Sequence, residues 1–169
     1  MPSDALRHYL QDHLAGSVAA LQLMETLADH ERGSPLEQQL RILHSQVSEE
    51  QNTLREILDR LGGGEGTLRQ VAGWLTEKAH AARLLIAGRT HPALARLDGL
   101  ESLALGLQGK LSLYRALQDV SPGEPRLGGY PFAALEARTL EQYAMVERER
   151  RGAAREAFTP ETDGRGTER

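Results

Sequence analysis

The chain of 169 residues contains no cysteine, and aromatic residues make up only 4% of it. The lack of cysteine excludes disulfides, thiolate metal sites and cysteine nucleophiles. With so few aromatic side chains, the core must be built mainly from leucine and alanine. Basic residues are not in excess, since the formal net charge is −4. This charge argues against nucleic acid as a partner, because general binding to nucleic acid requires a basic field.

Long hydrophobic runs are also lacking. No apolar stretch approaches the roughly 20 residues that span a bilayer, and the N-terminus has no apolar core of a signal peptide. We therefore expect a cytoplasmic protein that does not enter a membrane. The length suits one domain with a sizeable core.

Leucine is abundant instead, and it recurs at spacings of three and four residues, the pattern of amphipathic helices. Valine and isoleucine are scarce, and no segment alternates as a strand does. The sequence therefore predicts an all-α fold, with one domain over residues 1–158 and a flexible polar tail over 159–169. We expect five helical segments, at about 4–30, 36–61, 67–85, 93–120 and 132–158.

One helix boundary is marked clearly. Gly33 is a stop signal, and Ser34 can accept from exposed N–H groups at the start of the next helix. Pro35 suits the first helical position, and Glu37 would complete a capping box. Such a short connection predicts an antiparallel helix hairpin.

The fourth segment carries leucines on more than one face, which predicts neighbours on several sides. Gly106 and Gly109 lie within it, although glycine costs a helix about 1 kcal/mol relative to alanine. Either a neighbouring helix, Trp74 or Tyr114 packs against this notch, or the notch admits a ligand or a partner subunit.

Polar residues on the apolar stripes are the candidates for chemistry, because bundles hold metals with side chains that project inward. One interpretation is a metal held by His13, Glu50 and Glu101. The other is a polar cluster in which Glu50 pairs with His13, Lys110 or an arginine.

We favour the polar cluster, because a dinuclear site would show Glu-x-x-His spacings. Glu50 is instead followed three residues later by Thr53, and Glu141 by Ala144. The six histidines show no pairing at metal-ligand spacing. No Gly-x-Ser-x-Gly motif or phosphate-binding glycine loop is present.

The texture of several segments resembles the ferritin-like superfamily, and in particular small bacterial ferritin-like proteins of unassigned function. The resemblance covers about residues 4–158, and the segments that carry it are 9–16 (YLQDHLAG), 36–62 (ending LREILDRLG), 100–110 (LESLALGLQGK) and 137–151. It implies a ferritin-like four-helix bundle with an additional helix. Metal-binding members supply a carboxylate or Glu-x-x-His from each of four helices. The corresponding inward positions here are mainly Leu43, Val47, Thr53, Lys110 and Tyr143.

This departure predicts a non-catalytic bundle without a cofactor, which acts through protein contacts, as a dimer or other homo-oligomer or with a protein partner. The alternative is a metal-binding protein or metal-dependent oxidoreductase, with iron or manganese on His13, Glu50 and Glu101. A further hypothesis is a small-molecule site at the notch of Gly106 and Gly109.

Overall fold

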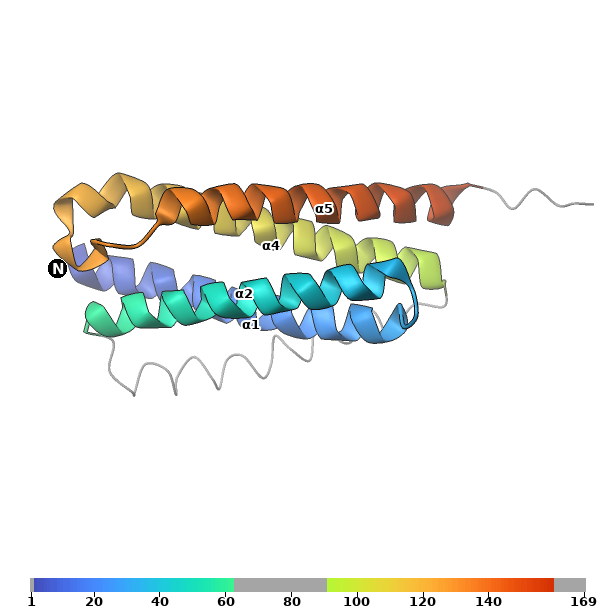
Figure 1. Ribbon diagram of the computed structural model, residues 1–169, viewed down its shortest axis with the longest axis horizontal. Helices are drawn as coiled ribbons and strands as arrows, with labels where there is room; N and C mark the ends of the chain where they lie inside the picture. The colour runs from blue at the N-terminus through green and yellow to red at the C-terminus, as the bar shows by residue number, and fades with distance from the viewer. Residues whose placement is uncertain (1, 63–90, 160–169) are drawn as a thin grey trace, which may run out of the picture.

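The computed structural model describes residues 2–62 and 91–159, and four α-helices account for most of them (Figure 1). They are α1 (Pro2–His30), α2 (Pro35–Arg60), α4 (Pro92–Val120) and α5 (Phe132–Phe158). Neither described range contains a strand, so the all-α prediction is confirmed for this part of the chain. Four of the predicted segments correspond to these helices with nearly the predicted bounds.

Some predictions fall on other residues. The predicted helix over 67–85 and the tail beyond Thr159 lie outside the described residues. The loop predicted between the last two helices contains two 3-10 turns, Ser121–Gly123 and Pro125–Leu127, and Leu127 is buried against the core.

The α1–α2 connection forms as predicted, with one difference. Ser34 Oγ accepts from the Glu37 N–H at 3.2 Å, and Pro35 occupies the first turn. The Glu37 carboxylate accepts from the Gly33 N–H at 2.7 Å, because the Ser34 N–H donates to Glu31 O at 2.9 Å. The reciprocal bond therefore reaches one residue further back than in a capping box. Gly33 has a φ of +85°, which glycine adopts without strain.

The helices form a bundle in which each packs against two neighbours: α1 against α2 and α4, and α5 against α4 and α2. α1 and α5 run in one direction, and α2 and α4 in the other (Figure 1). α2 therefore ends, and α4 begins, at opposite ends of the bundle. Arg96 fastens one end, because it pairs with Glu31 after α1 (2.6 Å) and with Glu156 near the end of α5. At the other end, Arg60 lies over the Tyr130 ring.

The core follows the predicted stripe of α2. Every residue of that stripe is buried: Leu36, Leu40, Leu43, Val47, Glu50, Leu54, Ile57 and Leu61. α4 buries leucines against both α1 and α5, as its several apolar faces predict, although Leu105 is 75% exposed. One carboxylate, Glu50, thus lies in an otherwise apolar row.

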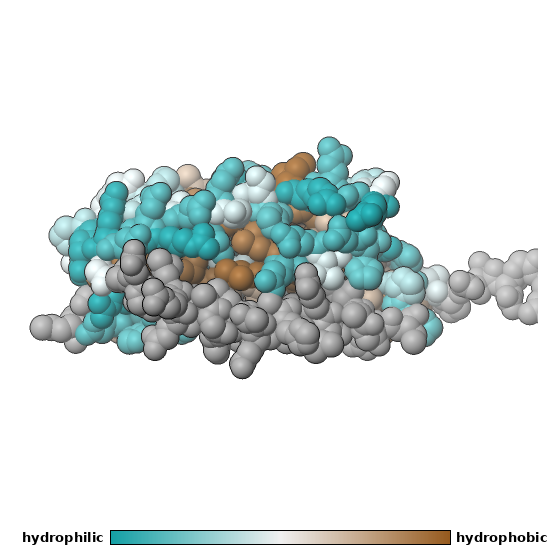
Figure 2. Space-filling view, turned by 90° about the horizontal axis from the view of Figure 1, so that it is seen from below, coloured by the Kyte–Doolittle hydropathy of each residue, from teal (hydrophilic) through white to brown (hydrophobic). Residues whose placement is uncertain are grey.

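The outer surface is mostly polar. In the view of Figure 2, hydrophilic residues cover most of the coloured face, and hydrophobic residues gather near its middle. Among the helices of residues 2–62 and 91–159, none has both the length and the apolar character that crossing a membrane requires.

Candidate functional site

Glu50 is the centre of a buried polar cluster made by α2, α4 and α5. The residue is 4% exposed. Lys110 on α4 donates from Nζ to Glu50 Oε2 and, at 2.6 Å, to Gln142 Oε1. Gln142 on α5 donates from Nε2 to Glu50 Oε1 at 3.0 Å, and Arg138 Nε lies 3.5 Å from the same oxygen. Both carboxylate oxygens are therefore paired.

This pairing explains how a carboxylate can occupy a leucine position of α2. A buried charge is costly unless it is paired and hydrogen-bonded. Burial lowers the pKa of Lys110 below its usual value, whereas the charge and hydrogen bond of Glu50 oppose that shift. The interpretation of Glu50 as part of a polar cluster with Lys110 or an arginine is confirmed.

The three candidate metal ligands do not come together. Glu101 is exposed on α4, where it accepts from Arg150 of α5 at 3.2 Å. His13 on α1 packs edge-on against Tyr9, with ring centroids 4.6 Å apart. Within residues 2–62 and 91–159, no three His, Cys, Asp or Glu side chains are grouped so that they could hold a metal ion. The groups around Glu50 are two cationic side chains and one amide, and a single carboxylate with such neighbours is suited to an ion pair and not to metal binding.

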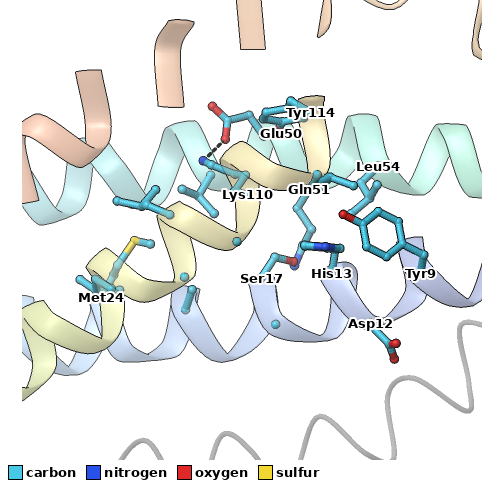
Figure 3. A pocket seen from close by; sticks show the side chains of 18 residues that line it. Tyr9, Asp12, His13, Ser17, Met24, Glu50, Gln51, Leu54, Lys110 and Tyr114 are labelled. Atoms are coloured by element: carbon cyan, nitrogen blue, oxygen red, sulfur yellow. Dashed lines mark hydrogen bonds and ion pairs between the residues drawn. The ribbon is translucent and has the colours of Figure 1, made fainter. Parts of the chain in front are cut away.

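A cavity of about 400 Å³ lies beside the cluster, between α1, α2 and α4 (Figure 3). Glu50 and Lys110 form part of its wall. The aliphatic and methionine side chains of the wall are those of Ala20, Met24, Val47, Leu54, Leu103, Leu107 and Leu113.

Polar side chains gather at one end of this cavity. Gln51 of α2 extends toward α1, where its Nε2 donates to Ser17 Oγ at 2.8 Å. The Tyr9 side chain extends from α1, and its hydroxyl points toward the Gln51 side chain (Figure 3). His13 lies between them, and burial lowers its pKa while the Asp12 charge opposes the shift. Met24 lies toward the other end (Figure 3). The cavity is thus polar at one end and apolar at the other.

The glycines of α4 differ in their surroundings. A Cβ built on Gly99 would lie 2.7 Å from Leu27 Cδ2, so α4 approaches α1 closely there. Gly106 and Gly109 line the cavity, and in the described part of the chain no atom lies within 4 Å of a Cβ built on either. No described residue therefore packs against the predicted notch. Tyr114 lines the same cavity, and Trp74 lies outside the described residues.

Sequence reasoning missed Gln142 and Gln51. The predicted stripe of α5 placed Tyr143 inward, whereas the helix buries Gln142 and leaves Tyr143 half-buried. A signal was present, because Gln142 lies three residues after Thr139 and four before Val146, and both of these are buried.

Comparison of the chain with protein-family models, with curated proteins and with solved structures gives no match.

Proposed function

We propose that this chain is a non-catalytic bundle of the ferritin-like class, in which a lysine takes the place of the metal and the protein acts through protein contacts. The Lys110 ammonium, paired with the buried Glu50 carboxylate at the middle of the bundle, carries this proposal. In metal-binding members, inward carboxylates from the helices share their charge with metal ions. Here the Lys110 ammonium, which is a covalent part of the chain, balances the charge of the Glu50 carboxylate.

The topology supports the assignment to this class. Because α2 ends and α4 begins at opposite ends of the bundle, the intervening chain has to join those two ends (Figure 1). One long connection of this kind is a feature of ferritin-like folds. The resemblance of residues 4–158 to that superfamily points the same way.

We infer the surface for these protein contacts from exposed residues on the first half of α5. Ala133, Ala137, Leu140 and Ala144 are all exposed, and Leu140 is 45% exposed. Their spacing of four, three and four residues places them on one face of the helix. Small residues let a second helix approach closely, and an isologous contact would pair this face with the same face of a second copy. We propose that this face, the α5 seam, forms a homodimer.

Metal analysis tests the replacement of the metal. We expect the full chain, purified without chelator, to carry far less than one iron, manganese or zinc per chain. The same content is expected in Glu50→Gln and in the double variant Glu50→Leu/Lys110→Met. A nearly stoichiometric metal that disappears in both variants would overturn the proposal in favour of a metal-dependent oxidoreductase or metal-binding protein.

Analytical ultracentrifugation over a range of concentrations tests the α5 seam. The wild type is expected to dimerise, and Leu140→Glu is expected to sediment as a monomer. Leu105→Glu is the matched control, because Leu105 is an exposed leucine of α4 outside the seam, and this variant should still dimerise. A wild type that remains monomeric at all concentrations would refute the dimer.

A further inference from the structure

We propose that the cavity between α1, α2 and α4 binds a small, uncharged, largely apolar organic molecule that carries one hydrogen-bonding group. This site goes beyond the self-association and the metal replacement proposed above, and either of those can fail without affecting it.

The size and walls of the cavity suit such a molecule. Its volume of about 400 Å³ falls in the range of small-molecule sites, about 300 to 1,000 Å³. Such sites combine mainly apolar walls with a few placed polar groups. Met24, Leu103 and Leu107 are among the apolar wall residues here.

The polar end offers hydrogen-bonding atoms that the fold itself does not use. Gln51 is 5% exposed, and its Nε2 donates a hydrogen bond to Ser17 Oγ. No donor among residues 2–62 and 91–159 forms a hydrogen bond with its Oε1. Tyr114, whose residue is also 5% exposed, lines the cavity beside Glu50, away from that end (Figure 3), and its hydroxyl has no hydrogen bond within the same residues. Gln51 lines the cavity, and a hydroxyl or amine of a ligand would provide the donor that its Oε1 lacks.

The charges around the cavity favour an uncharged molecule. Glu50 forms ion pairs with Lys110 and Arg138, so the ammonium of Lys110 already has a carboxylate partner. His13 has a lowered pKa, which keeps its imidazole neutral at pH 7. Asp12 points away from the other labelled side chains (Figure 3). An anion would therefore lose its hydration at this site without gaining a cation.

Glycines supply the space. Gly16 of α1 and Gly106 and Gly109 of α4 all line the cavity, and no atom of the described residues comes within 4 Å of a Cβ built on any of them. Glycine disfavours a helix relative to alanine, and at Gly99 a close helix contact accounts for it. No such contact is found for the other three in the described part of the chain. What these three glycines provide is volume facing the cavity.

A fluorescence titration of the full chain with N-phenyl-1-naphthylamine tests the site. This probe is uncharged, mostly apolar and has a single N–H group. We expect a saturable rise in emission at about one probe per chain, with affinity at least tenfold weaker in Gly109→Leu, which fills the cavity. Gly152→Leu is the matched control, because Gly152 is a helical glycine of α5 outside the cavity, and it should bind as the wild type does.

Gly16→Leu fills the same cavity from α1 and provides a second variant if Gly109→Leu does not fold by circular dichroism. Wild-type affinity in the folded cavity-filling variants would overturn the site, and so would an equal loss in Gly152→Leu. The charge preference is tested with 1-anilinonaphthalene-8-sulfonate, which adds a sulfonate to the same ring system. We expect the wild type to bind this anionic probe at least tenfold more weakly than N-phenyl-1-naphthylamine. If the wild type binds both probes equally and Gly109→Leu abolishes binding of the anionic probe, the assignment to an uncharged ligand is overturned.

Discussion

The two sides of α4 are built in different ways. Toward α5, its side chains are joined by polar contacts: Lys110 meets Gln142 at 2.6 Å, and Arg115 meets Glu136 at 2.7 Å. Toward α1, α4 packs closely at Gly99, but further along Gly109 opens onto the cavity. Gly109 and Lys110 are consecutive and both line the cavity, but only the Lys110 side chain also reaches across to the polar contacts with α5.

The polar cluster draws on three of the four described α-helices. Glu50, Lys110, Gln142 and Arg138 come from α2, α4 and α5, and α1 contributes no side chain to the cluster. A cation carried on a lysine stem is held by its own helix, so three helices satisfy it. α1 is therefore not needed for this pairing; it packs against α2 and α4 and forms one wall of the cavity.

The largest effect is expected from removing the cation on the α5 side. In Lys110→Met, Glu50 stays buried with the amide of Gln142 and with Arg138 at 3.5 Å. Removing one partner of a buried ion pair costs about 3 to 5 kcal/mol of stability. Because Arg138 remains near Glu50, we expect the free energy of unfolding to fall by about 3 kcal/mol. The free energy of unfolding in urea measures it.

The double variant Glu50→Leu/Lys110→Met is the control for this prediction. Replacing both charges with apolar side chains is often neutral, so we expect a stability within about 1 kcal/mol of the wild type. If the single variant Lys110→Met is as stable as the wild type, the ion pair with Lys110 does not offset the cost of burying Glu50.

A smaller effect, of opposite sign at two glycines, sharpens the contrast along the α1 side. Gly99→Ala places a Cβ against Leu27, which is 1% exposed and has little room to move. We therefore expect this variant to be less stable than the wild type by about 1 to 2 kcal/mol. Gly106→Ala meets no described atom and is expected to gain about 0.5 to 1 kcal/mol from helix propensity. Urea midpoints of the two variants compare them, and a loss in Gly106→Ala would show that this position is closely packed.

The features that the sequence predicts correctly are local. The stripe of α2 follows from helical periodicity, and Glu50 stands out because it interrupts that stripe. The cap at Ser34 depends on neighbouring residues and is also found. The identity of Lys110 as a partner of Glu50 was one of several alternatives, and pattern alone could not choose among them.

What could not be predicted depends on how the helices are placed relative to one another. The residue of α5 that lies level with Glu50 is set by the axial offset of two helices, and a rotation of α5 by one residue distinguishes Gln142 from Tyr143. The cavity is harder still, because Gly99 and Gly106 are the same residue type on one helix. Only the distance to α1 separates a close contact from open space.

The smallest expected effect probes the cavity side through pH. Burial holds the pKa of His13 below the ordinary value of 6.5. As the pH falls through 6.5, the unfolded chain takes up a proton on this imidazole before the folded chain does, so the free energy of unfolding decreases; above that pH both states are neutral and this contribution is constant. His13→Gln should therefore lose less stability than the wild type between pH 7 and pH 5 in urea titrations. His8→Gln, which removes an exposed imidazole from the same helix, is the matched control. Parallel pH profiles for the wild type and His13→Gln would contradict a neutral, partly buried His13 beside the cavity.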